Sequence, residues 1–298
     1  MEEARKPLCL PFRHITLGHI IDTHSPGIYN PQEKGNITFL IDTSRRIFHL
    51  RVSEITMRLK SLGDRERAEV NQRFFKTGKG EYAEGDVFVG LRVPEIRQWA
   101  REYEKLSFAE ITRLLHSPIH EARLLALLIL VQSYRKGDAT FQRQIYNLYL
   151  QNTRFINNWD LVDVSAEHIV GRYLKNRSRS PLHTLAGSDL LWERRISILA
   201  TFHYIKCGEF AETLRIAERL LRDPEDLIHK AVGWMLREIG NRDRLTEEAF
   251  LKRHYRMMPR TMLRYAIETF PERLRQQYLR RGSGNNRKSE ETNQKRGI

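Results

Sequence analysis

Three stretches of the chain share one plan: LLHSPIHEARLLALLIL at residues 114–130, LAGSDLLWERRISILATF at 185–202 and LLRDPEDLIHKAVGWML at 220–236. Each holds the end of one helical pattern, a short polar turn and a second helical pattern. A basic residue stands in the first turn of the second pattern, namely Arg123, Arg195 or Lys230. Arg195 and Lys230 lie 35 residues apart, a spacing typical of repeated helical pairs. One pair cannot cover its own apolar face, so we expect an all-α solenoid of stacked pairs with a concave, basic groove.

Helical periodicity covers most of the chain between residues 49 and 280. We expect helices at 54–62, 65–75, 94–103, 107–115, 120–134, 140–150, 159–174, 191–204, 209–221, 224–239, 246–254 and 260–270. The glycine-rich stretch 76–86 is predicted to be a loop. Residues 1–48 contain four prolines and no sustained helical period, which predicts a separate N-terminal extension. Residues 281–298 are nearly devoid of apolar side chains, which predicts a disordered basic tail.

The composition favours a polyanionic partner. The 298 residues include 51 Lys and Arg against 37 Asp and Glu, a net charge of +14. Such an excess suits nucleic acid or an anionic membrane surface, although basic residues also keep helical proteins soluble. The longest apolar run, 124–131, is too short to cross a bilayer, and the N-terminus lacks the apolar core of a secretory signal. Cys9 and Cys207 make neither a disulfide framework nor a zinc spacing, so we expect a cytoplasmic protein.

The segment FINNWDLVDVSAEHIVGRYL at 155–174 carries the most unusual pair of residues. Trp159 and Asp163 are four apart, so on a helix they share one face, and a carboxylate beside an indole suits a groove better than a core. If the repeats are in register, Arg195, Lys230 and Trp234 face the same side. Each residue has an ordinary alternative: a core tryptophan, a surface carboxylate or an interhelical arginine. Their joint placement in successive repeats is what favours a functional site.

From about residue 52 to 279 the chain resembles the bacterial DNA alkylation repair (AlkD-like) family of HEAT-type helical-repeat DNA glycosylases. The resemblance is carried by FFKTGKGEYAEGDVFVGLRVPEIR (74–97), INNWDLVD (156–163), WERRISIL (192–199), KAVGWMLREIGNRD (230–243) and MPRTMLRYAIETF (258–270). It implies a glycosylase domain over 49–280, acting as a monomer on double-stranded DNA that contains alkylated purines. Neither residues 1–48 nor the tail has a counterpart in it.

The family uses two tryptophans, an aspartate and an arginine. Carried over by motif, these are Trp159, Trp234, Asp163 and Arg195, with Arg194 as the less favoured arginine. The resemblance implies hydrolysis of the N-glycosidic bond of cationic N3- or N7-alkylpurines, in which Asp163 stabilises the oxocarbenium-like transition state. The indoles attract the cationic base, and Arg195 is expected to grip a phosphate. An open solenoid groove suggests that there is no deep pocket for a flipped base.

Further basic residues are expected to contact DNA phosphates, so that binding weakens steeply with salt. They are Arg194, Lys230, Lys76, Lys79, Arg237, Arg260 and Arg264.

Other functions fit the residues less well. A non-catalytic helical-repeat scaffold that binds nucleic acid or protein is the main alternative, and it gives no reason for Asp163 in the groove. No metal or other cofactor is expected, because the 11 histidines are scattered and form no HExxH motif. The stretch KTGKGE at 76–81 lacks the spacing of a phosphate-binding loop.

Overall fold

The computed structural model describes residues 51–281, and the regular structure of this part is helical. The chain divides into two units, Met1–Arg46 and Ile47–Ile298, and the described residues belong to the second. The predicted extension at 1–48 and the predicted tail after Arg281 lie outside the described residues. The prediction of stacked helical pairs is confirmed.

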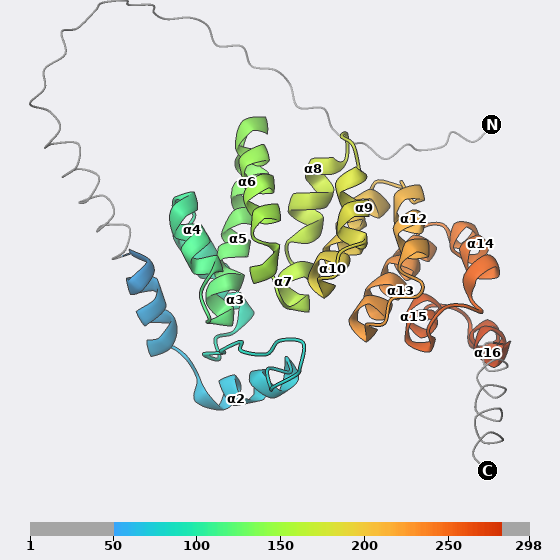
Figure 1. The fold of residues 1–298 in the computed structure, drawn as a ribbon, viewed down its shortest axis with the longest axis horizontal. Coiled ribbons are helices and arrows are strands. Elements are labelled where there is room, and N and C mark those ends of the chain that lie inside the picture. The colour runs from blue at the N-terminus through green and yellow to red at the C-terminus, as the bar shows by residue number, and fades with distance from the viewer. Residues whose placement is uncertain (1–50, 282–298) are drawn as a thin grey trace, which may run out of the picture. The chain divides into compact units, whose positions relative to one another are not determined.

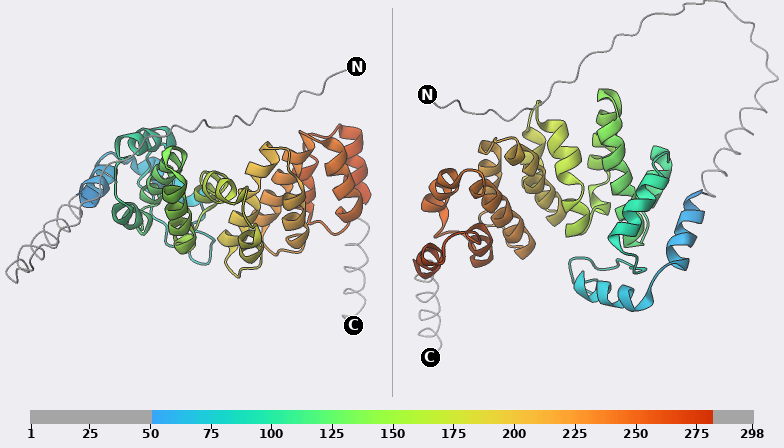
Figure 2. Two further views of the ribbon diagram at one scale, coloured as in Figure 1. Left: turned by 90° about the horizontal axis from the view of Figure 1, so that it is seen from above. Right: turned by 180° about the vertical axis from the view of Figure 1, so that it is seen from behind.

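The helices form two layers (Figure 1). The first is a continuous series in which each helix packs on the next: α5 (His120–Lys136), α7 (Trp159–Asp163), α10 (Leu191–Ala200), α13 (Asp226–Gly240) and α15 (Arg260–Ala266). The second layer packs on α5, α10 and α13, and consists of α4 (Phe108–Leu115), α6 (Ala139–Gln151), α9 (Ser180–Ala186), α12 (Ala211–Arg219) and α14 (Arg244–His254). Figure 2 shows the two layers from above and from behind. Each pair thus covers the apolar face that its neighbour leaves open.

Short elements complete the described chain. These are η2 (Thr153–Phe155), η3 (Glu167–Gly171), α8 (Arg172–Leu174), α11 (Phe202–Lys206) and, at the C-terminal end, α16 (Glu272–Arg281). At the N-terminal end, residues 51–61 are helical and α2 (Arg65–Phe74) and α3 (Val93–Glu102) follow. Helical periodicity does not predict α9 or α16, so both are additions to the expected set of helices.

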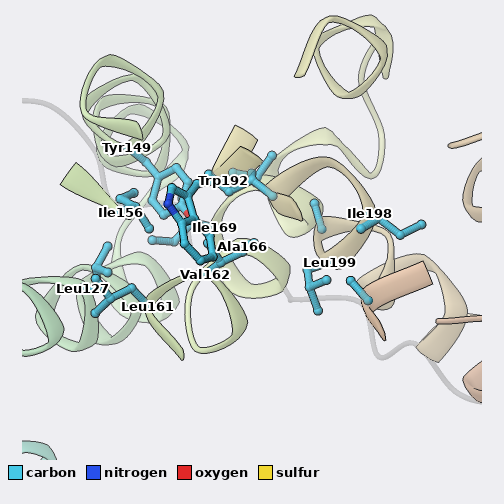
Figure 3. Close-up of a cluster of buried hydrophobic side chains, with 14 of the residues drawn as sticks. Leu127, Tyr149, Ile156, Leu161, Val162, Ala166, Ile169, Trp192, Ile198 and Leu199 are labelled. Atoms are coloured by element: carbon cyan, nitrogen blue, oxygen red, sulfur yellow. The ribbon is translucent and has the colours of Figure 1, made fainter. Parts of the chain in front are cut away.

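The core runs through the contacts between α5 and its neighbours. Helix α5 is apolar on nearly every side and is buried from His120 to Val131, as expected for a helix enclosed by others. Figure 3 shows part of the core, in which Leu127 lies with side chains of α6, α7 and α10 such as Tyr149, Leu161 and Trp192. No helix among residues 51–281 combines the length and apolarity that a membrane span needs.

The predicted single helix at 159–174 is wrong. The segment contains the short helix α7, a turn, the π-helix η3 and the short helix α8. Gly171 lies at the end of the π-helix, and a Cβ at this position would lie 2.0 Å from the Ala200 carbonyl oxygen. The backbone here therefore approaches α10 closely, which only glycine permits.

The repeat register is also corrected by the structure. The Arg123 and Arg194 guanidiniums each donate through Nη1 to the carbonyl six residues earlier, at 3.0 Å in both cases, and His229 Nε2 lies 2.6 Å from the equivalent oxygen of Asp223. Arg123, Arg194 and His229 are therefore equivalent. Arg195 belongs one position later, with Lys230, and Arg123 is not its counterpart.

Candidate active site

A cavity of about 520 Å³ opens where α7, α10 and α13 lie side by side (Figure 1). It brings together the four predicted catalytic residues. Its lining consists of Phe74, Lys76, Tyr82, Trp159, Asp163, Arg195, Glu225, Asp226, Leu227, Lys230, Trp234, Arg237 and Tyr265. The volume lies in the range of small-molecule sites. The loop after α2 supplies Lys76 and Tyr82 to the lining.

The Asp163 carboxylate is held by Arg195 in a bidentate ion pair. Arg195 Nε donates to Asp163 Oδ1 at 3.0 Å and Nη2 donates to Oδ2 at 2.9 Å, while Nη1 donates to the Leu227 carbonyl at 2.6 Å. Arg195 is only 5% exposed. Burial raises the pKa of the Asp163 carboxyl above its ordinary value, although the adjacent guanidinium acts in the opposite direction.

This geometry differs from the expected role of Arg195. All three nitrogens of its guanidinium already donate hydrogen bonds within the protein, so the side chain is not an exposed phosphate ligand here. The physical reason is its place in the repeat: the second residue of the Arg194–Arg195 pair faces α7, where it meets a carboxylate. In this arrangement Arg195 orients Asp163.

Trp159 stands at the end of an aromatic stack. Its ring is nearly parallel to that of Phe75, with centroids 5.1 Å apart, and Phe74 contacts it edge-on at 5.9 Å. Asn158 caps the first turn of α7, because its Oδ1 accepts from the Trp159 amide at 2.8 Å. Phe74 and Phe75 were not identified as site residues from the sequence, although both stand in a motif that carries the family resemblance. Their clustering places the indole in the cavity wall.

Tyr82, in the loop 76–86, is a further site residue that the sequence does not identify. Its ring contacts Trp192 edge-on at 5.8 Å, and burial raises the pKa of its phenol. The loop is closed by a hydrogen bond of 3.2 Å from the Ala83 amide to the Lys76 carbonyl. Within it, the Glu81 carboxylate accepts from the Gly78 amide at 2.8 Å. The predicted loop is therefore an ordered part of the site.

Trp234 enters the cavity from α13 and is half-buried. Its Nε1 donates to Glu238 Oε1 at 3.2 Å, and its ring lies 5.7 Å from that of Phe202. Next to it, a Cβ on Gly233 would meet both the Met262 carbonyl oxygen and Tyr265 Cβ at 2.5 Å. This close approach of α13 and α15 brings Tyr265, a residue not identified from the sequence, into the cavity lining.

The predicted cationic residues fall into two groups. Lys76, Lys230 and Arg237 line the cavity, where Lys230 pairs with Asp226 at 2.8 Å and Arg237 pairs with Glu268. Outside the lining are Lys79 and Arg264, which are exposed, Arg260, whose Nη1 donates to the Leu279 carbonyl at 2.6 Å, and Arg194. The Arg194 guanidinium binds the buried Asp223 carboxylate, with Nε 2.6 Å from Oδ2.

The charge in the cavity is nearly balanced. Four cations line it, namely Lys76, Arg195, Lys230 and Arg237, against the three carboxylates of Asp163, Glu225 and Asp226. The net charge of the whole chain is thus not concentrated in the cavity. Within residues 51–281, no group of three or more His, Cys, Asp and Glu side chains is arranged to hold a metal ion.

Comparison with known proteins agrees with the helical-repeat fold. The family model described as "DNA alkylation repair enzyme" matches residues 55–270, and the chain belongs to this family. A solved structure from Enterococcus faecalis, described as a predicted DNA alkylation repair enzyme, is similar with a TM-score of 0.55 at 16% identity, over 70% of this chain and 97% of that one. AlkD2 from Streptococcus mutans is also 16% identical over 70% of this chain and 99% of its own, with a TM-score of 0.45. No curated protein matches the chain.

Proposed function

We propose that this protein is a DNA glycosylase that removes cationic N3- or N7-alkylpurines from double-stranded DNA. Alkylation at either nitrogen makes the base positive, and the base leaves as a neutral group without a strong general acid. Positive charge then moves to the deoxyribose in an oxocarbenium-like transition state. The reaction thus needs a carboxylate beside the sugar, in a site from which water is partly excluded.

The observation that carries the proposal is the placement of Asp163. Its carboxylate lines the cavity, is desolvated enough for its pKa to rise, and is fixed by two hydrogen bonds from Arg195. Each oxygen of a carboxylate has a second acceptor direction, so the bond to Arg195 leaves each able to face the sugar or a water. A carboxylate that is held in place loses little free energy to reorientation when the charge develops.

The aromatic residues around Asp163 suit a cationic base. An indole face attracts a cation by about 0.5–2 kcal/mol, and Trp159 and Trp234 both line the cavity. Because Phe75 stacks on Trp159, the plane of this indole is set before DNA binds. Neutral lesions such as uracil gain nothing from this attraction, and we expect them to be poor substrates.

DNA phosphates are proposed to contact the cations in and around the cavity. The set consists of Lys76, Lys79, Lys230, Arg237, Arg260 and Arg264. Arg194 is omitted, since its guanidinium is engaged by Asp223 and by the carbonyls of Ser188 and Asp189. We propose that the protein acts as a monomer in the cytoplasm. The logarithm of its DNA affinity should fall linearly with the logarithm of salt concentration.

The decisive experiment incubates the protein with methylated duplex DNA and identifies the released bases by chromatography. Asp163→Asn should retain DNA binding and lose most base release, and Asp189→Asn, which removes the same charge from an exposed position outside the lining, should release bases normally. Salt-dependent DNA binding without release by the wild-type protein would favour the non-catalytic scaffold. Equal release by Asp163→Asn and wild type would require another catalytic residue.

A further inference from the structure

A buried polar cluster holds the end of the loop 76–86 against α5 and the residues before α7. Its centre is the Asp86 carboxylate, which is 4% exposed. Asp86 Oδ2 lies 3.1 Å from His120 Nδ1, and Oδ1 accepts from Asn157 Nδ2 at 3.0 Å and pairs with Arg123 Nη2 at 2.5 Å. The end of the loop is therefore bound to the start of α5 and to the residues that precede α7.

The opposite nitrogen of the His120 ring reaches α7 itself. Nε2 lies 2.8 Å from Asp160 Oδ2, and the histidine side chain is 2% exposed. Both ring nitrogens thus face carboxylate oxygens, which at neutral pH only accept hydrogen bonds. A neutral imidazole has a single N–H and would turn its lone pair toward one carboxylate. The geometry favours an imidazolium, which can donate from both ring nitrogens.

The charges around His120 balance only in that state. Asp86 faces the ring from the loop, Asp160 faces it from α7, and Arg123 lies one turn along α5. With His120 protonated, two positive charges meet two negative charges. The two carboxylates raise the pKa of His120 although burial and Arg123 act against them. Loss of the proton would leave a net negative charge in a buried cluster, which is costly.

The same ring also supports the aromatic stack behind Trp159. The His120 centroid lies 4.3 Å from that of Phe88 in a stacked arrangement and 5.3 Å from that of Phe75. Phe75 in turn stacks on Trp159 at 5.1 Å. One histidine therefore contacts both parts of the cavity wall: the α7 side with Trp159, and the loop that carries Tyr82.

We propose that His120, as an imidazolium, is a positioning residue that ties α7 to the loop 76–86 and so holds Trp159 and Tyr82 in the cavity. When His120 loses its proton as the pH rises, the end of the loop loosens from α5 and α7. The effect on base release rests on the proposed function. The effect on the loop does not depend on it.

The test monitors the loop without any catalytic assay. The amides of Val87 and Val89 are bound by the Pro118 carbonyl at 3.1 Å and by the Glu121 carboxylate at 3.1 Å, so their hydrogen exchange reports loop opening. We expect the wild-type exchange rate, corrected for intrinsic base catalysis, to rise at least tenfold as His120 titrates in an NMR experiment. In His120→Gln these amides should exchange, at every pH, at the corrected rate that the wild type reaches only after His120 has lost its proton. His183→Gln is the matched control, because His183 pairs with the single carboxylate of Glu212 at 2.6 Å and lies outside the cavity lining.

A second readout separates this proposal from the glycosylase proposal. If methylated DNA is a substrate, the rate of base release should decline as pH rises, with the same midpoint as the titration of His120. In His120→Gln this decline should be absent from the pH profile. A neutral His120 at pH 7, or corrected exchange that ignores its titration, overturns the positioning role even if release is normal. Titration-linked exchange in a protein that releases no base would sustain it while the glycosylase proposal fails. The wild-type titration gives this answer even if His120→Gln does not fold.

Discussion

Replacing Arg195 by methionine tests how the carboxylate of Asp163 is held. Two charge-assisted hydrogen bonds of 3.0 and 2.9 Å join the side chains, which are 6% and 19% exposed. Breaking such a buried pair from one side costs about 3–5 kcal/mol, because the remaining charge stays buried without its partner. We therefore expect Arg195→Met to lower the free energy of unfolding at pH 7 by about that amount. The loss should shrink at acidic pH, where the unpaired carboxyl takes up a proton.

A double-mutant cycle by urea unfolding isolates the pair. We expect Asp163→Asn and Arg195→Met together to lower the free energy of unfolding by more than the double variant does. The difference, the coupling free energy, should be at least about 2 kcal/mol. The exposed pair Lys230–Asp226, whose side chains are 40% and 56% exposed, is the control and should couple by less than about 1 kcal/mol. Losses at 163 and 195 that add to within about 0.5 kcal/mol would refute the reasoning.

Three further predictions concern individual residues. Gly233→Ala should lower the free energy of unfolding by about 1–3 kcal/mol, because the new methyl group meets the Met262 carbonyl and Tyr265 at 2.5 Å; unchanged urea unfolding would contradict the close helix approach. Glu247 is fully buried, neither of its side-chain oxygens is hydrogen-bonded, and burial raises its pKa to about 8. The folded protein therefore binds this proton more tightly than the unfolded chain does. The free energy of unfolding of the wild type should fall as pH rises from about 4.5 to 8, by at most roughly 5 kcal/mol. In Glu247→Gln this pH-dependent loss should vanish from thermal melts, and its persistence would assign it to another group. Since burial raises the pKa of Asp163, base release should be lost on acidification at a higher pH than an ordinary aspartate allows; kcat/KM against pH measures this, and an acid limb at or below the ordinary value would speak against Asp163.

Much of the fold can be predicted from local patterns. The apolar periodicity of α5 and α13 predicts both helices, and Ser107 predicts the start of α4, where its Oγ accepts from the Glu110 amide at 3.3 Å. The short α9 and the strongly polar α16 were not predicted, because neither offers enough apolar residues to reveal a period. The segment after Trp159 has a helical period, yet it contains a turn and a π-helix that packs against α10.

The candidate site was predicted in its residue types and only partly in its connections. Trp159, Asp163, Arg195 and Trp234 line one cavity, as the register of the repeats and the resemblance suggested. The contributions of Phe75, Tyr82 and Tyr265 were not predicted. Phe75 stacks behind Trp159 from the end of α2, Tyr82 reaches the cavity through the path of a loop, and Tyr265 reaches it through the close approach of two helices at a glycine. Neither the path of a loop nor the close approach of two helices leaves a periodic pattern in the sequence.

The helical class, the repeated pairs and the residues able to form the site follow from local patterns in the sequence, because helices depend on interactions within a few positions of the chain. The pairing of Arg195 with Asp163 and the contacts of His120 with Asp86 and Asp160 become visible in the folded chain. These partners lie 32, 34 and 40 residues apart in the chain. Contacts at such separations depend on how helices stack and where a loop is anchored, which the order of the residues does not reveal.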